Sequence, residues 1–423
     1  MKSLLSFSMV LSVLWSAPLS VHAEGPDWLS AKSEAQKILQ DLVKIDSANP
    51  SGNEIAAAKY LKALFDKADI PTKIIEPQPG RANLIARLKG DKTKRPLILL
   101  SQGRGNSDMK SVIAAQAVSM LLFKRMHLPI HRDIIFMSTA DEEAGGKVGI
   151  QYLLKEHRDE FANAEVAFGE GSRGRPATKD GKVWWVGIQT TEKRTVNLRV
   201  VAKGTAGHAM LQKPDNAIYA LSRALAKISR YQPPFKPDST AREFVQQVSK
   251  LTNQPPDWIQ KLRSSTRESD QLAYSMLFST FSATMINGGI RGNAIPAQAE
   301  AIINARLVPS SGAEALVEGF TRLVDDPQVS IELQEPELPA IPSSSIKNEV
   351  FEAFKTVVTS TFGAHVPVIP TVGTGKTDSY YLRAAGIQAY GMEPFVEDRD
   401  QNTRKGFQDG VIFYYDLLRE IQK

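Results

Sequence analysis

Runs of apolar residues alternate with amphipathic stretches along most of the chain. Short apolar runs predict buried strands at 97–101 and 132–138, and the apolar spacing of 109–125 predicts a helix between them. A strand, a helix and a second strand in this order favour a parallel sheet with the helix packed on one face. Both strands then end at one edge of the sheet, where open α/β folds place their sites.

The same kind of apolar spacing predicts further helices and strands before and after this strand–helix–strand unit. Helices are expected at 30–46, 57–65, 346–362, 377–385 and 411–421. Further strands are expected at 72–75, 83–88, 164–171 and 182–189. These elements together predict one α/β domain with a mostly parallel sheet flanked by helices.

The pattern changes near residue 193. Val196, Leu198 and Val200 alternate with polar residues, as in a strand with one exposed face. Helices are then expected at 216–231 and 313–324, and strands at 278–286, 299–307 and 329–333, before a proline-rich linker at 335–342. We therefore expect the α/β domain to comprise 24–192 and 336–423, with a smaller α+β domain inserted at 193–335.

Composition is that of an ordinary globular protein. The chain has 423 residues, of which 42% are hydrophobic and 23% charged, with a formal net charge of +6. No long block of like charge is present, so nucleic-acid binding is not predicted. The chain has no cysteine, so no disulfide supports the fold and no thiol can bind a metal or attack a substrate.

The N-terminus has the features of a secretory signal peptide. Lys2 supplies the positive start, residues 4–19 are mostly apolar, and Val21-His22-Ala23 is a small-x-small cleavage pattern. A membrane anchor is the alternative, but the apolar run is short and Pro18 interrupts it. We expect the signal peptide to be 1–23 and the mature protein to be periplasmic or secreted, without a membrane segment.

Three acidic residues follow the second buried strand. Asp141, Glu142 and Glu143 are adjacent, and each carboxylate raises the pKa of its neighbours. A divalent cation would relieve this repulsion and could leave one carboxylate free as a base. The alternative is a strand that ends in solvated acids.

Several motifs together resemble the M20 metallopeptidases and their aminoacylase and carboxypeptidase relatives. They are Asn49-Pro50-Ser51-Gly52-Asn53-Glu54, Gly103-Arg104-Gly105 with Asp108-Met109-Lys110, Asp141-Glu142-Glu143 with Gly145-Gly146, Glu170-Gly171, Gly207-His208, Asn216-Ala217, Asn293-Ala294-Ile295-Pro296, Arg306, Thr377-Asp378-Ser379 and Ala389-Tyr390-Gly391. The resemblance covers nearly all of the mature chain. It implies a catalytic-type α/β domain, an inserted dimerisation-type domain and hydrolysis of peptide or N-acyl amino acid amide bonds.

The resemblance also implies a dinuclear zinc centre at the sheet edge. Asp108 would bridge the two metal ions, Glu143 and Glu170 would be terminal ligands, and Glu142 would be the general base. Metal ions in such a centre polarise the scissile carbonyl and lower the pKa of a bound water, whose proton the free glutamate takes.

Residues outside this edge have further implied roles. His208 would reach across a homodimer to the developing oxyanion. Arg306, Asn293 and Thr377 are candidates for holding a substrate carboxylate. Two alternatives stay open, because His208 could be a surface turn residue and Arg306 could form a structural ion pair.

Two histidine motifs of the family are missing. The family follows the strand at 97–101 with His-x-Asp and a long loop, whereas Ser101-Gln102 runs directly into Gly103 here. A His-Gly ligand motif is also missing from 398–406. The remaining carboxylates form an all-oxygen set, which suits magnesium, calcium or manganese better than zinc. Lys376, where the family has a small residue, could partly neutralise the carboxylates.

Three hypotheses follow from these departures. The first is an M20-type amidohydrolase that binds zinc poorly and turns over little or nothing, and so is a pseudoenzyme. The second is an exported, non-catalytic binding protein for peptides or acyl-amino acids. The third is a sequence that has lost two active-site loops by truncation, which predicts the same molecule as the first.

Overall fold

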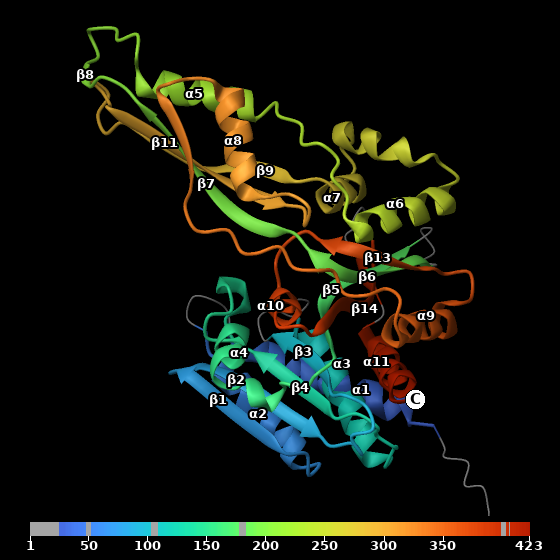
Figure 1. The fold of residues 1–423 in the computed structure, drawn as a ribbon. Coiled ribbons are helices and arrows are strands. Elements are labelled where there is room, and N and C mark those ends of the chain that lie inside the picture. The colour runs from blue at the N-terminus through green and yellow to red at the C-terminus, as the bar shows by residue number, and fades with distance from the viewer. Residues whose placement is uncertain (1–24, 48–51, 103–108, 177–182, 399–402, 406) are drawn as a thin grey trace, which may run out of the picture.

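The structure, a computed structural model, describes residues 25–47, 52–102, 109–176, 183–398, 403–405 and 407–423. The expected signal peptide and Asp108 lie outside these residues. The chain forms an α/β part with a large sheet and a second part with a smaller sheet, which lies at the opposite end of the molecule from the N-terminal helices (Figure 1).

The large sheet has nine strands in the order β1-β2-β4-β3-β5-β14-β6-β13, with β15 paired to β14. The strands are β1 (Thr72–Gln78), β2 (Arg81–Leu88), β3 (Leu97–Gln102), β4 (Ile134–Thr139), β5 (Val166–Pro176), β6 (Val183–Glu192), β13 (Val368–Gly373), β14 (Gln388–Asp398) and β15 (Thr403–Lys405). The sheet is mixed, whereas a mostly parallel one was expected. One reason is the two-residue connection Pro79-Gly80, with Gly80 at φ +81°, because so short a connection joins β1 and β2 as an antiparallel hairpin.

The central strands are parallel, as the strand–helix–strand pattern predicts. Strand β3 pairs in parallel with β4 on one side and with β5 on the other. Its side chains alternate between two cores, with Leu97 and Leu99 in one and Ile98 and Leu100 in the other. Burial on both faces explains why the sequence of this strand is apolar throughout.

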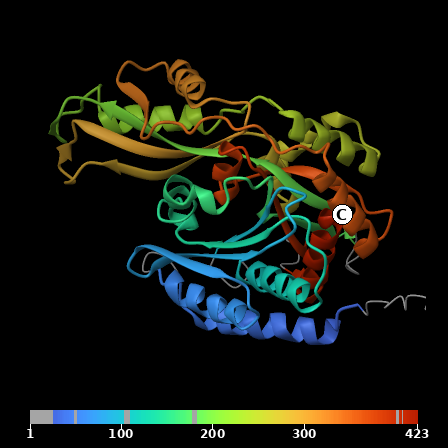
Figure 2. The same ribbon diagram turned by 60° about the horizontal axis from the view of Figure 1, so that its bottom comes forward.

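Helices cover both faces of the large sheet. One core includes α1 (Trp28–Lys44), α2 (Glu54–Asp66), α3 (Lys110–Arg125), α9 (Glu349–Phe362) and α11 (Phe407–Gln422), and the other includes α4 (Ile150–Glu156) and α10 (Asp378–Ala384). Figure 2 shows α1 and α2 below the sheet and the second part of the chain above it. Short 3₁₀ helices η1 (Glu142–Ala144) and η2 (Arg158–Glu160) interrupt the connections after β4 and α4.

The inserted part is built on an antiparallel sheet in the order β12-β7-β11-β9. These strands are β7 (Arg194–Lys203), β9 (Thr280–Gly288), β11 (Gln298–Leu307) and β12 (Val329–Leu333), and α5 (Ala217–Ile228) and α8 (Ala313–Val324) pack with them in one core. Val196, Leu198 and Val200 are buried and alternate with less buried neighbours, as predicted. The short strands β8 (Gly207–His208) and β10 (Ala294–Ile295) pair with each other.

Like α4, three consecutive helical segments before β9 had no counterpart among the expected elements. They are α6 (Ser239–Thr252), η3 (Pro256–Ser264) and α7 (Glu268–Leu277), which share a core with Trp185 of β6 and Ile369 of β13. Asp238 caps α6 through a 2.8 Å hydrogen bond from the Ala241 backbone N–H. That cap, followed by the helical spacing of Ala241, Phe244 and Val245, is a signal that identifies α6 in the sequence.

None of the helices in the described ranges is both long and apolar enough to cross a lipid bilayer.

Candidate active site

The carboxyl ends of β3, β4 and β5 bring several predicted residues to one place. Glu142, Glu170 and Thr377 line the same small pocket, together with Gln102 and Asp378. The pocket has a volume of about 10 Å³ for the centre of a water-sized sphere, which suffices for roughly one water molecule. Acidic side chains therefore lie together at the sheet edge where the sequence predicted them.

Glu170 is engaged by an amide from the neighbouring strand. The Nε2 atom of Gln102 donates a 2.7 Å hydrogen bond to Glu170 Oε2. Gln102 is the last residue of β3 and is 95% buried, so the bond forms where water has little access. One of the carboxylates expected to bind metal is therefore a hydrogen-bond acceptor for an uncharged side chain.

Asp141 has a positive partner that the sequence did not reveal. Arg81 donates from Nη2 to Asp141 at 3.0 Å and from Nε to Glu54 at 2.8 Å. Asp141 adopts φ +65°, a left-handed conformation that aspartate tolerates better than most residues. A guanidinium on β2 thus relieves the charge of the first acid in the Asp141-Glu142-Glu143 run, where a divalent cation was expected.

Asp378 is buried at the start of α10, beside the pocket. Thr139 donates a 2.7 Å hydrogen bond to its carboxylate. Burial raises the pKa of Asp378 to about 7, while the bond from Thr139 and the charge of Lys376 oppose that rise. Burial thus disfavours the charged form of this carboxyl group.

A second buried carboxylate, Glu192, lies at the end of β6. It accepts hydrogen bonds from Gln189, at 2.8 Å, and from Thr377, and it forms an ion pair with Arg383. Burial raises the pKa of Glu192, although Arg383 and Thr377 act against this. Thr377, expected to hold a substrate carboxylate, donates its hydroxyl hydrogen to Glu192.

Lys376 lies close to these acids, but its ammonium group donates a hydrogen bond to Tyr381. Its Nζ donates to the Tyr381 hydroxyl at 2.5 Å and lies 4.6 Å from the centre of the Tyr381 ring. The Tyr381 hydroxyl in turn donates to the Gly145 carbonyl at 3.2 Å. Lys376 thereby ties α10 to the loop after β4, while its charge lowers the pKa of Asp378.

The other predicted site residues lie at varying distances from the pocket. Glu143 is exposed and is not among the residues that line it. Arg306, on β11, donates from Nη1 to the Thr374 carbonyl at 3.1 Å, three residues before Thr377. The inserted sheet therefore contacts the loop that leads into α10.

His208 and Asn293 lie together in the inserted part, away from the pocket. The Ala209 N–H donates to the Asn293 carbonyl at 3.0 Å, and Ala294 pairs with His208 across β8 and β10. His208 is exposed, and its Nδ1 accepts a 3.2 Å hydrogen bond from the Met210 backbone N–H. Within one chain, neither residue contributes to the pocket.

Among the described residues, the donor set at the pocket does not fit a zinc centre. Within the described ranges, no group of three or more His, Cys, Asp or Glu side chains is arranged to hold a metal ion. No histidine lines the pocket, and Gln102 supplies an amide beside Glu170. Zinc sites in proteins depend on nitrogen or sulfur ligands, which this part of the chain does not supply.

Three residues of the site were missed in the sequence. Asp378 appeared only within the Thr377-Asp378-Ser379 motif and Gln102 only beside the missing histidine motif, and Glu192 was not considered. The position of Asp378 at the head of a helix after a buried strand resembles that of the predicted acids and is a usable signal. For Glu192 no local signal exists, because its burial depends on Arg383, which lies far along the chain.

Comparison with known proteins identifies the inserted part. Residues 190–332 match the M20 peptidase dimerisation domain. The crystal structure of Sso-CP2, an M20 family metallo-carboxypeptidase from Sulfolobus solfataricus, superposes with a TM-score of 0.64 at 15% sequence identity. The superposition covers 92% of this chain and 98% of that one, which shows a common fold.

The relatives found by sequence carry the names of hydrolytic enzymes. "Probable carboxypeptidase S-like 1" of Dictyostelium discoideum is 27% identical over 339 residues, covering 76% of this chain and 66% of that protein. A "Probable succinyl-diaminopimelate desuccinylase" of Staphylococcus aureus is 25% identical over 322 residues, covering 70% of this chain and 74% of that protein. The chain thus spans just under two thirds of the Dictyostelium protein. It carries an M20 peptidase dimerisation domain, and its homologues and structural neighbours are M20 family metallopeptidases and hydrolases.

Proposed function

We propose that this chain is an exported M20-type hydrolase in which zinc-dependent cleavage of peptide or N-acyl amino acid amides is weak or absent. The observation that carries the proposal is that no histidine among the described residues lines the pocket, where Glu170 accepts a hydrogen bond from the Gln102 amide. A carboxylate that accepts a hydrogen bond can still bind a metal ion, but zinc needs nitrogen or sulfur ligands beside it. The names of the relatives support the substrate class, since a desuccinylase removes an acyl group from an amino acid.

A second candidate function is ligand binding without catalysis. Arg306 supports it, because this exposed guanidinium donates, within the described residues, one hydrogen bond to the Thr374 carbonyl in the loop before Thr377. Its remaining N–H groups suit a ligand carboxylate, which arginine binds with two parallel hydrogen bonds. An acyl-amino acid or a peptide C-terminus supplies such a group.

The dimerisation domain suggests a homodimer. Strand β9 lies at the edge of the inserted sheet and exposes Met285 and Ile286, with Ile290 beyond its end. An exposed apolar edge strand is prone to pair with another chain, and a second copy of β9 would cover it. His208 would then lie near the partner subunit. Sedimentation equilibrium tests this arrangement, and a mass of one chain at micromolar concentration contradicts it.

The deciding experiment measures metal content and hydrolysis together. After dialysis, we expect the purified protein to contain far less than one zinc ion per chain by mass spectrometry. With zinc added, its hydrolysis of N-acetyl amino acids should equal that of Glu142→Gln, the matched control that removes the expected general base. A working general base contributes about 10²- to 10⁴-fold, so two zinc ions per chain and a loss of that size in Glu142→Gln would refute the proposal.

Titration calorimetry in the presence of a chelator tests the second candidate. N-acetyl amino acids should bind to the chain without metal, and Arg306→Met should weaken that binding by about tenfold, because a bidentate ion pair is lost. Arg322→Met is the control, since Arg322 is an exposed arginine on α8 of the same inserted part. Equal binding by all three proteins would exclude Arg306 as the carboxylate-binding residue.

A further inference from the structure

A large cavity opens at the edge of the sheet opposite the candidate active site. Its volume is about 750 Å³, within the range of small-molecule sites. Its walls are the end of β2, the loop before β3, Asp133 just before β4, and the segment 159–163. Because β3 and β4 begin here and end at the candidate active site, the cavity is separate from that site.

The loop before β3 carries most of the positive charge. Lys89, Lys92, Lys94 and Arg95 lie within seven residues that contain a single acid, Asp91. The Asp91 carboxylate accepts hydrogen bonds from the backbone and hydroxyl of Thr93, at 2.9 and 2.7 Å, and lies 2.8 Å from His131 Nδ1. These contacts lower the pKa of Asp91 to about 2, with the Thr93 hydroxyl as the largest cause. The one acid of the loop is therefore engaged by Thr93 and His131 and does not pair with the lysines of the loop.

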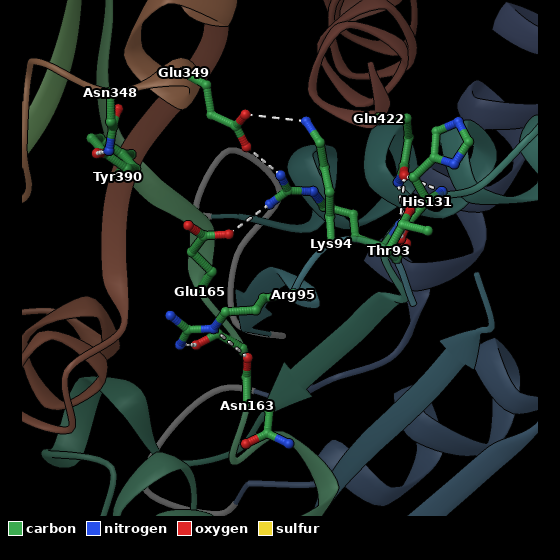
Figure 3. Close-up of polar contacts among 12 residues, drawn as sticks. Thr93, Lys94, Arg95, His131, Asn163, Glu165, Asn348, Glu349, Tyr390 and Gln422 are labelled. Carbon is green, nitrogen blue, oxygen red and sulfur yellow. Dashed lines mark hydrogen bonds and ion pairs between the residues drawn. The ribbon is translucent and has the colours of Figure 1, made fainter. Parts of the chain in front are cut away.

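Two of the cations have no partner within the described part of the chain. Lys89 and Lys92 are exposed and make no hydrogen bond or ion pair there. Arg95 donates to the carbonyls of Asn163 and Ala164, each at 3.2 Å, so its charge is held in place but not neutralised (Figure 3). Lys94 differs, since it pairs with Glu349 at 3.1 Å.

The acids that line the cavity are largely neutralised by the protein itself. Asp133 pairs with Arg87 at 2.8 Å and accepts the Gly90 N–H at 2.9 Å. Glu160 pairs with Lys73 at 2.5 Å. Of the cavity's carboxylates, Asp159 alone has no such ion pair in the described part of the chain. The cavity thus has a surplus of positive charge, from Lys89, Lys92 and Arg95 against Asp159.

We propose that this cavity binds a small polyanion, a molecule with two or more phosphate or carboxylate groups. Lysine ammonium groups act as mobile point charges for such groups, and Arg95 adds a fixed guanidinium. A small ligand fits the concave shape better than a membrane surface or a nucleic acid does, and the Asp159 carboxylate in the lining would repel a long polyanion. The site is independent of the proposed hydrolase function, since it shares no residue with the candidate active site.

Isothermal titration calorimetry with inorganic pyrophosphate tests the proposal on the full chain. We expect saturable binding that weakens in high salt, because exposed charges are screened. The double variant Lys89→Gln/Lys92→Gln should bind about tenfold more weakly, since both unpaired cations are lost. The matched control is Lys59→Gln/Lys67→Gln, which removes two exposed lysines at α2 and should bind pyrophosphate as the unchanged protein does.

Three outcomes would overturn the proposal. The first is no pyrophosphate binding by the unchanged protein. The second is equal weakening in both double variants, which would indicate a general charge effect. The third is binding to phosphatidylglycerol vesicles without binding to pyrophosphate, which would assign the surface to membranes. Urea unfolding of both variants should match that of the unchanged protein, so a loss of binding cannot be ascribed to misfolding.

Discussion

Charged side chains are paired differently at the two ends of the parallel strands, called here the carboxyl edge and the amino edge of the large sheet. At the carboxyl edge, acids have partners within the protein. Glu170 accepts a hydrogen bond from Gln102, Asp141 forms an ion pair with Arg81, and Glu192 forms one with Arg383. At the amino edge, Lys89 and Lys92 have no partner in the described part of the chain. The edge that resembles an active site is internally compensated, whereas the edge without a recognised motif retains free charge.

The difference shows that acidic residues at a sheet edge do not by themselves make a metal site. Glu170 and Asp141 could keep their hydrogen bonds from Gln102 and Arg81 and still bind an ion, but the described residues around them supply no nitrogen ligand for zinc. Lys89 and Lys92 lose no bond within the described residues when an anion arrives, and they give up only part of their hydration.

The largest effect should come from breaking the buried ion pair at the carboxyl edge. The side chains of Arg383 and Glu192 are 3% and 0% exposed, so Arg383→Met leaves Glu192 as a buried charge without its partner. We expect a loss of about 3–5 kcal/mol in the free energy of unfolding. The loss should be smaller at pH 5 than at pH 8, because Glu192 can then take up a proton.

Urea unfolding at both pH values measures this loss. Arg322→Met, which removes an arginine that is 76% exposed and 3.8 Å from Glu318, should change stability by less than about 0.5 kcal/mol. A similar small change in Arg383→Met would mean that the carboxyl edge does not depend on internal compensation.

A smaller effect of opposite sign is expected at Asp378. Its folded pKa of about 7 lies above the value near 3.9 of an unfolded aspartate, so between these values the folded state binds more protons than the unfolded state. Stability should therefore fall as pH rises from about 4 to 7. Asp378→Asn removes this penalty and should gain about 1–3 kcal/mol at pH 8, with little gain at pH 4.

Unfolding curves recorded at several pH values between 4 and 8 test this expectation. The Thr139 hydroxyl can still donate to the asparagine side-chain oxygen, which makes the substitution nearly isosteric. A stability difference that stays constant across this pH range would show that Asp378 does not titrate there.

The smallest effect on stability is expected at the amino edge. Lys89→Gln/Lys92→Gln should change the free energy of unfolding by less than about 0.5 kcal/mol, because neither exposed side chain has a partner in the described part of the chain. Thermal or urea unfolding measures this. A loss of several kcal/mol would mean that the lysines stabilise the fold, and the contrast between the two edges would then disappear.

Most elements could be predicted because their signals are local. The continuous apolar run of 97–101 and the helical spacing of 109–125 correspond to β3 and α3, and the alternation of Val196, Leu198 and Val200 corresponds to β7. The mixed sheet was not predicted, since strand direction depends on which strands become neighbours. The helices α6 and α7 were missed although α6 has a cap and an amphipathic pattern.

The site was only partly predictable. Motifs placed Glu142 and Glu170 at one sheet edge, and the structure brings both to one pocket together with Thr377, which was expected outside that edge. The partners of these side chains come from elsewhere, as with Gln102 for Glu170 and Glu192 for Thr377. Predicted roles for Glu143, His208, Asn293 and Arg306 stay predictions, and Asp108 lies outside the described residues.

The sequence alone determined the order of most helices and strands, the presence of an inserted part and the edge at which the acids gather. These follow from periodicity and from the rule that parallel strands end together. Only the tertiary structure decided which charges are compensated, because Arg81 meets Asp141 across 60 residues of chain and Arg383 meets Glu192 across 191. Hydrogen bonding and burial are properties of spatial neighbours, and distant residues become neighbours only when the chain folds.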